Sequence, residues 1–162
     1  MPAILGIDIG TSSTKVMLLD PQTGEQWVQA QAYDVSTPRI GYAEQDPDLW
    51  WQAVLSCLAR LREQKGELYR QIACIGLSGQ MHGLVMTDEA GVPVRPAILW
   101  NDQRSGEECE FLREQLSEKQ QREVLRNRIF PGFALPSLLW VRRHEPEVFA
   151  RARWVMQPKD YV

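Results

Sequence analysis

The first twenty residues constrain the fold more than any other part of the chain. A short apolar run at residues 4–9 ends at a glycine, and a second apolar run follows at residues 14–19. Only a tight Gly-Thr-Ser turn separates the two runs, and this spacing is typical of a β-hairpin. Turn-forming residues at 20–24 precede a third stretch, 27–33, in which apolar and polar residues roughly alternate. The chain is therefore predicted to open with three antiparallel strands.

Helices and further strands alternate after this opening. Asp46 is predicted to cap a helix with Pro47 in its first turn, because aspartate at the cap and proline just inside are typical of helix starts. Its core-facing side chains at helical spacing are Trp50, Val54, Cys57, Leu58 and Leu61, with Trp51 expected beside Trp50 in the core. Further strands are expected at 72–77, 84–86, 97–100 and 154–156. This order predicts an α/β fold with a mixed sheet and helices packed on it.

Two later helix starts carry capping signals. Ser105 and Glu108 have the spacing of a capping box, and Ser117 with Gln120 has the same spacing. Arg104, just before the first of these helices, is expected to pair with Glu107 or Glu108, although a direct catalytic role is the alternative. Another helix is expected to open at Pro136.

Length and charge limit the classes of protein. The 162 residues, 44% of them hydrophobic, can bury one sizeable core, so residues 1–162 are predicted to form one domain. A net charge of −3 without a basic stripe argues against nucleic acid as a partner. No apolar run approaches the roughly 20 residues that cross a bilayer, and the first residues lack the basic flank of a secretory signal. We therefore expect a cytoplasmic protein without a membrane partner.

The three cysteines are expected to be buried thiols. Cys57, Cys74 and Cys109 are odd in number, lack Cys-x-x-Cys spacing, and each lies in a segment that is predicted to face the core. The two histidines, His82 and His144, are too scattered to indicate a metal cluster.

The opening hairpin carries a candidate phosphate site. Asp8 ends a run apolar enough to be buried, and a buried carboxylate needs a cation or hydrogen-bond donors. Gly10, Thr11 and Ser12 offer close backbone approach and hydroxyl donors, and Lys15 adds positive charge. This group suits magnesium-bound polyphosphate, since Mg²⁺ is often held by a single carboxylate together with substrate phosphates. The alternative, that the triplet merely closes a hairpin and Asp8 accepts turn N–H groups, stays open.

A second candidate site lies where the strand at 72–77 ends. Gln80, Met81 and His82 stand between two glycines at a bend, which packing alone explains poorly. Amide and imidazole groups can both donate and accept hydrogen bonds to sugar hydroxyls. Taken alone, His82 is better explained as a hydrogen-bonded structural histidine.

The end of the next predicted strand repeats this combination. Trp100 offers an apolar wall for sugar C–H groups, and Asn101 and Asp102 offer polar tips for hydroxyls. With two such clusters in one chain, contact with a polyol is the favoured interpretation of both.

Together, five segments resemble the FGGY carbohydrate kinases, and among them the bacterial xylulokinases. The resemblance runs in order along almost the whole chain, and the Gln-Met-His-Gly and Trp-Asn-Asp segments are the ones that indicate xylulose. The segments are residues 6–12, 44–47, 79–83, 98–102 and 158–161.

The resemblance implies a ribonuclease H-like (actin-like ATPase) fold and an enzyme that uses ATP and Mg²⁺. It implies that Asp8, Thr11 and Ser12 face the ATP phosphates and the metal. It also implies that the ketopentose touches a set of side chains with Gln80 and Trp100 close by, namely Met81, His82, Asn101 and Asp102. The general base of the family has no counterpart in this chain, so the chain is expected to be the N-terminal domain of a longer kinase whose C-terminal domain is its missing partner.

Several alternatives remain at this stage. One is a kinase of the same family that acts on another pentulose, gluconate or glycerol, and another is a non-catalytic actin-like module that binds nucleotide. Gln103 and Ser137 differ from the residues expected in many relatives, which weakens the choice of sugar more than the choice of family. The oligomeric state stays open, with a homodimer among the options.

Overall fold

The computed structural model describes residues 2–162, which form two compact units. The first, here the sheet unit, combines the chain up to Val35 with Asp46–Gln80 and Pro158–Val162. The second, here the helix-rich unit, combines Ser36–Gln45 with Met81–Gln157. Each unit is therefore built from segments that are distant in the sequence.

The sheet unit contains one four-stranded mixed sheet with the order β3-β2-β1-β5. Strands β1 (Ala3–Ile9), β2 (Ser13–Leu19) and β3 (Gln26–Ala32) are antiparallel neighbours, and β5 (Ile72–Gly79) runs parallel to β1. The predicted three-strand opening and the α/β mixed sheet are confirmed.

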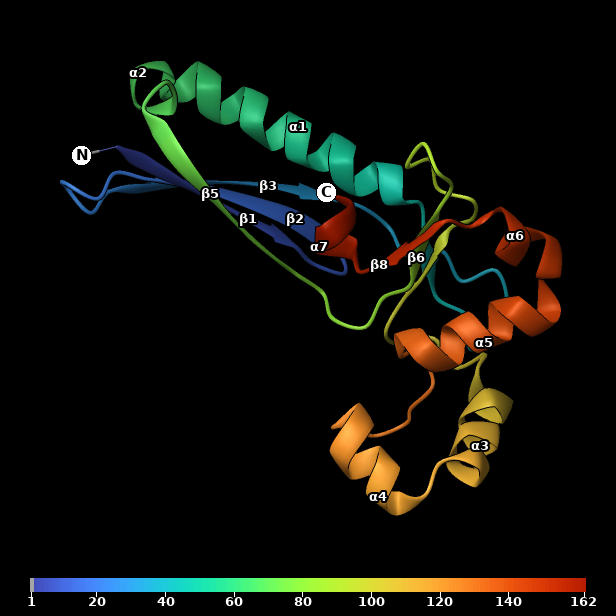
Figure 1. Ribbon diagram of the computed structural model, residues 1–162. Coiled ribbons are helices and arrows are strands. Elements are labelled where there is room, and N and C mark those ends of the chain that lie inside the picture. Colours follow the sequence, from blue (N-terminus) through green and yellow to red (C-terminus); the bar gives the residue numbers. More distant parts are fainter. Residues whose placement is uncertain (1) are drawn as a thin grey trace. The chain divides into compact units, whose positions relative to one another are not determined.

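Helix α1 (Pro47–Gln64) covers one face of this sheet over β2 and β3 (Figure 1). The side chain of Asp46 accepts a hydrogen bond from the backbone N–H of Asp48 and so caps the helix as predicted. Trp50 is buried against the strands, but the prediction for Trp51 is wrong, because its side chain is 41% exposed on the outer side of the helix. Two short helices complete the unit, α2 (Gly66–Tyr69) and α7 (Pro158–Tyr161).

The helix-rich unit is held by two short antiparallel strand pairs. Strand β4 (Glu44–Gln45) pairs with β7 (Ala97–Ile98), and β6 (Val85–Thr87) pairs with β8 (Trp154–Met156). Helices α5 (Ala134–His144) and α6 (Pro146–Arg151) contribute to a core whose buried members are Leu84, Met86, Ile98 and Val141.

The remaining helices of this unit are α3 (Gly106–Gln115), α4 (Glu118–Gln120) and η1 (Gln121–Leu125), the last a π-helix. The capping box of Ser117 and Gln120 is confirmed. The one expected at α3 is wrong: Ser105 makes no side-chain cap bond, and Glu108 is buried against Arg143, with 3.1 Å between its Oε1 and the Nη1 of that arginine.

Two of the three cysteines are buried and one is exposed. Cys57 and Cys109 are buried free thiols, and burial raises the pKa of both. The prediction for Cys74 is wrong, because it lies exposed on β5 at the edge of the sheet. Across residues 2–162, no helix is long and apolar enough to cross a membrane.

Candidate functional site

The turn between β1 and β2 is closed by backbone contacts. The N–H of Gly10 donates to the carbonyl of Ser13 at 3.0 Å, and a Cβ at position 10 would lie 2.8 Å from that oxygen. Glycine is therefore required here by space. The hydroxyl of Tyr33 donates to the carbonyl of Gly10 at 2.7 Å, and burial raises the pKa of this phenol. The turn is thus anchored to the residue that directly follows β3.

Asp8 lies on the sheet face opposite α1. Its predicted burial is wrong: alternation along β1 buries Ile7 and Ile9 and leaves the Asp8 side chain exposed. Lys15 is its partner on β2 and Ser78 its partner on β5, and all three line an open cavity of about 490 Å³. The carboxylate is therefore accessible to a ligand.

Thr11 and Gln80 meet in the sheet unit although 69 positions separate them. The hydroxyl of Thr11 donates to the side-chain carbonyl of Gln80 at 3.2 Å, and the backbone N–H of Gln80 donates to the carbonyl of Ile9 at 2.7 Å. A residue predicted to contact phosphate is thus bonded to one predicted to contact sugar.

The bend after β5 places Met81 and His82 in the helix-rich unit. His82 has a left-handed backbone with φ of 62°, and the N–H of Gly83 donates to the carbonyl of Met81 at 2.8 Å. Met81 is 68% exposed. The imidazole of His82 stacks on the ring of Phe133, with 3.8 Å between centroids and 11° between planes. This stacking fixes the plane of the imidazole.

Trp100 and Asn101 are exposed, but Asp102 is fully buried. The Asp102 carboxylate accepts hydrogen bonds from the backbone N–H of Ala43 at 2.6 Å and from that of Arg104 at 2.8 Å. It also binds the Arg104 guanidinium with both oxygens, at 2.9 Å to Nε and 2.8 Å to Nη2. The carboxylate is thus occupied by partners within the chain.

Arg104 is the centre of a buried ion network. Its expected pairing with Glu107 or Glu108 is wrong, because its guanidinium instead binds Asp102 and lies 2.7 Å from the Oε1 of Glu44. Burial alone would lower the pKa of Arg104, but hydrogen bonds to the two carboxylates outweigh it and raise the pKa. The guanidinium carbon lies 3.9 Å from the ring centroid of Tyr42. The sequence carried no local signal for this network, since Glu44 is distant from Arg104 in the chain.

Residues 132 and 133 connect the two predicted sugar segments. Gly132 has φ of 78°, and a Cβ there would lie 2.2 Å from the carbonyl oxygen of Trp100 and 2.9 Å from that of Asp102. Because Phe133 stacks on His82, one short segment touches both the bend at 82 and the loop at 100–102. The two predicted sugar segments therefore lie near each other. Sequence analysis missed this role, although the Phe-Pro-Gly-Phe run at 130–133 marks a break.

Among residues 2–162, no group of three or more His, Cys, Asp or Glu side chains is arranged to hold a metal ion. The exposed groups of Asp8, Ser12 and Lys15 nevertheless suit a metal that arrives with phosphate. Mg²⁺ needs only one or two protein carboxylates when phosphates and water supply the other ligands.

Comparison with known proteins places these segments in a family. Residues 3–162 match the model of the FGGY family of carbohydrate kinases, N-terminal domain. The chain is 41% identical to the xylulose kinase of Lactococcus lactis over 162 residues, which is all of this chain and 32% of that protein. It thus spans about a third of the length of this curated relative.

Solved structures share the fold. The xyloylose kinase from Brucella ovis superposes with a TM-score of 0.92 at 41% identity, covering 98% of this chain and 33% of that one. The gluconate kinase from Lactobacillus acidophilus superposes with a TM-score of 0.88 at 26% identity, covering 98% and 32%. The fold is therefore the actin-like ATPase fold of the sugar kinases.

Proposed function

The chain belongs to the FGGY family of carbohydrate kinases, and on this basis we propose that it is the N-terminal part of a kinase that phosphorylates D-xylulose. The reaction transfers the γ-phosphate of ATP to a hydroxyl of the sugar and gives D-xylulose 5-phosphate and ADP. The rest of the protein, a C-terminal domain, supplies the general base and the adenine pocket. The cytoplasm is the compartment where both substrates would be available.

The sugar is held by side chains of the helix-rich unit. Met81 and Trp100 give apolar surface to its C–H groups, and His82 and Asn101 exchange hydrogen bonds with its hydroxyls. Asp102 was expected to contact the sugar. Because its carboxylate is buried and bound to Arg104, its role in this proposal is to position the Trp100–Asn101 loop.

The phosphates are held by the sheet unit. Thr11 and Ser12 donate hydroxyl hydrogens, Lys15 offsets negative charge, and Asp8 would hold Mg²⁺. When bound, Mg²⁺ would neutralise charge on the phosphate oxygens. In phosphoryl transfer of this kind, positioning and charge neutralisation supply most of the catalysis.

The hydrogen bond between Thr11 and Gln80 is the observation that carries the proposal. It ties the phosphate segment to the first residue of the sugar segment within the sheet unit. A hairpin that merely closed a sheet, as in the alternative interpretation, would not need this link.

Calorimetry of the 162-residue chain tests the sugar assignment. We expect weak binding of D-xylulose and a loss of at least about tenfold in affinity for His82→Ala, because a hydrogen bond and the stacked ring disappear. His144→Ala is the matched control, because His144 is the other histidine and stacks on Trp140 outside the proposed site. Equal affinities of the two variants for D-xylulose would contradict the assignment of His82 to the sugar site.

A second sugar remains the main competitor, because the chain is also similar to a gluconate kinase. Titrations with gluconate and glycerol under the same conditions decide between them. Binding of gluconate or of glycerol in place of D-xylulose would assign the chain to a kinase of the same family with that other substrate. Binding of ATP with none of the three would favour a non-catalytic nucleotide-binding module.

A further inference from the structure

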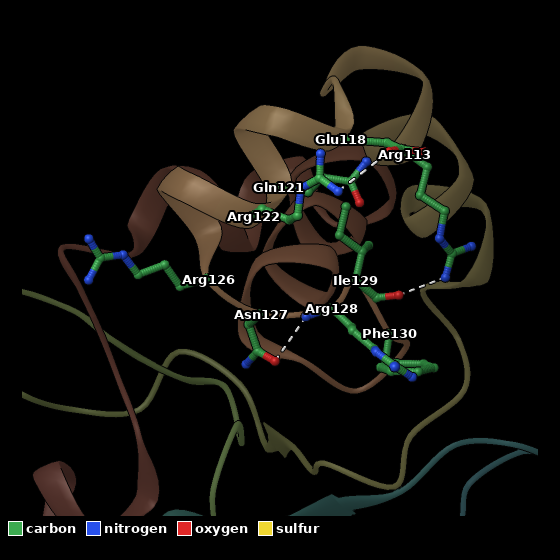
Figure 2. A pocket seen from close by; sticks show the side chains of 9 residues that line it. All are labelled: Arg113, Glu118, Gln121, Arg122, Arg126, Asn127, Arg128, Ile129 and Phe130. Carbon is green, nitrogen blue, oxygen red and sulfur yellow. Dashed lines mark hydrogen bonds and ion pairs between the residues drawn. The ribbon is translucent and has the colours of Figure 1, made fainter.

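An arginine-rich pocket lies in the helix-rich unit, and none of the residues proposed for ATP or sugar lines it. Its cavity volume of about 930 Å³ is in the range of small-molecule sites. Figure 2 shows the side chains that surround it, which come from the C-terminal part of α3, from α4 and η1, and from the segment that follows them. They are Arg113, Glu118, Gln121, Arg122, Arg126, Asn127, Arg128, Ile129 and Phe130.

The lining carries four arginines and a single carboxylate. Glu118 lies 3.8 Å from Arg122 in an exposed pair, and Arg113 pairs with Glu110, which is outside the lining. Among residues 2–162, neither Arg126 nor Arg128 forms an ion pair. The arginines of the lining therefore outnumber its carboxylates, although the chain as a whole is acidic with a net charge of −3.

The backbone at the pocket has two unusual features. Gln121–Leu125 is a π-helix. Such turns are rare in proteins as a whole, and those that occur often lie at functional sites. It ends at Arg126, which has a left-handed backbone with φ of 52° and ψ of 24°. A non-glycine residue in this region costs free energy and is concentrated at ligand-binding positions. Arg126, Asn127 and Arg128 all line the pocket, and Figure 2 shows the Arg126 side chain extending away from that of Arg128.

Phe130 and Ile129 add an apolar surface to the charged wall. Ile129 is buried beside Cys109 and Leu112, and its carbonyl accepts a hydrogen bond from Arg113 at 2.6 Å, as Figure 2 shows. Phe130 is partly exposed, and its ring lies 5.8 Å from the ring of Phe133. A ligand with one anionic end and one carbon-bearing end would match both kinds of surface.

We propose that this arginine pocket binds a small organic phosphate monoester. Guanidinium groups fit phosphate oxygens through paired, parallel N–H bonds, and neither Arg126 nor Arg128 has its charge offset by an ion pair among residues 2–162. Phe130 receives the carbon part of the ester. Sugar phosphates and nucleoside monophosphates share this chemistry. The inference goes beyond the proposed kinase function, because the pocket needs neither the sugar segments nor the hairpin.

The test uses the ¹⁵N-labelled 162-residue chain titrated with D-glucose 6-phosphate and with AMP in separate experiments. Inorganic phosphate reports the anion alone, and D-glucose reports the sugar alone. We expect at least one of the two esters to shift the amide signals of residues 126–130. D-Glucose should leave these signals unchanged. A preference for one ester assigns the source of the phosphate.

Variants locate the binding. Arg126→Gln with Arg128→Gln should weaken ester binding by at least about tenfold, because charge-assisted bonds to phosphate are lost. The matched control is Arg62→Gln with Arg70→Gln, which removes the same charge from exposed positions in the sheet unit and should change affinity less than about twofold. If the first double variant does not fold, lysine at both positions keeps the charge, removes the fork geometry, and should still weaken binding.

Three results would overturn the proposal. The first is equal ester affinity in the pocket and control variants, which would mean general charge attraction. The second is inorganic phosphate binding as tightly as both esters, which would remove the role of Phe130. The third is an oligouridylate that shifts residues 126–130 at lower concentration than either ester, which would assign the pocket to RNA.

Discussion

Gly132 controls the position of the Trp100 loop through the space that it leaves free. Its backbone is left-handed, and a Cβ there would overlap the carbonyl of Trp100 at 2.2 Å. We expect Gly132→Ala to destabilise the fold by about 1–2 kcal/mol for the backbone conformation and by about 1–3 kcal/mol more for the overlap. Thermal unfolding followed by circular dichroism measures the effect.

Gly91 provides the control for this variant. It has a similar φ of 82°, but a Cβ there meets no atom within 4 Å. Gly91→Ala should therefore lower the free energy of unfolding only through the backbone conformation, by about 1–2 kcal/mol. If both alanine variants lowered the melting temperature equally, the contact with the Trp100 carbonyl would not matter.

Tyr33 makes stability sensitive to alkaline pH. Burial raises the pKa of its phenol above the ordinary value of about 10, so the folded state keeps a proton that the unfolded state loses. The stabilisation is fully present below pH 10 and declines as pH rises through the raised pKa. Tyr33→Phe loses the bond to the Gly10 carbonyl, about 1 kcal/mol at pH 7.

Urea unfolding between pH 7 and pH 11 tests this dependence. The difference in unfolding free energy between the native chain and Tyr33→Phe should narrow above pH 10. The phenol of Tyr161 is partly exposed, donates to Asp48 and also has a raised pKa. Because both proteins contain it, its effect on the unfolding free energy cancels in the difference. A constant difference across the range would contradict the raised pKa of Tyr33.

At the scale of single residues, the sequence predicted the surroundings of two candidate residues incorrectly. Runs of apolar residues indicate strands. Whether a single side chain on a strand is buried depends on which face of the sheet a helix covers. Asp8 was therefore expected to be buried and is exposed, and Asp102 was expected at a sugar and is bound to Arg104. The partner Glu44 comes from another segment, which no local pattern indicates.

Among the elements, β5 is the most exposed strand of the sheet unit. Within residues 2–162 it pairs only with β1, and Ile75 and Leu77 are 60% and 50% exposed on one face. An edge strand with exposed apolar side chains is a template for association. We expect concentration-dependent self-association of the 162-residue chain, and Ile75→Lys should reduce it while the melting temperature changes little.

Sedimentation velocity over a range of concentrations measures this effect. Ile40→Lys is the control, because Ile40 is an exposed isoleucine in a turn of the other unit. Association that is the same in the native chain and in both variants would show that β5 is not the contact.

Elements with strong local signals were predicted well. The hairpin, the third strand and the cap of α1 follow from turn residues, alternation and Asp46, and all three are confirmed. The capping box predicted at the start of α3 is wrong, because Glu108 forms an ion pair with Arg143 of another helix and does not cap its own helix. Tertiary contacts of this kind override a capping pattern.

At the scale of the whole molecule, the single domain predicted for residues 1–162 stays a prediction, and the described residues divide into two compact units. The chain leaves the sheet unit after Val35, returns at Asp46, leaves again after Gln80 and returns at Pro158. Composition changes little at these crossings, so sequence carries no linker signal there. The resemblance to the FGGY kinases is confirmed by the family match, since it depends on several ordered motifs instead of one.

The kinase proposal makes a prediction for the whole chain. With ATP, Mg²⁺ and D-xylulose, the 162-residue chain should form no D-xylulose 5-phosphate, because the proposed general base lies outside it. Phosphorus NMR of the mixture measures the product, and a full-length xylulose kinase serves as the positive control. Steady accumulation of the sugar phosphate with this chain alone would refute the division of roles between two domains.

The ring of Phe133 lies parallel to the imidazole of His82 at 3.8 Å. A ring clamped in this way has lost most of its torsional freedom before any ligand arrives. A sugar hydroxyl that reaches His82 would therefore meet nitrogen atoms already aimed in fixed directions, and complex formation would lose less entropy at this side chain. Discrimination between sugars that differ in one hydroxyl would then arise from the angle of the imidazole as much as from its chemistry.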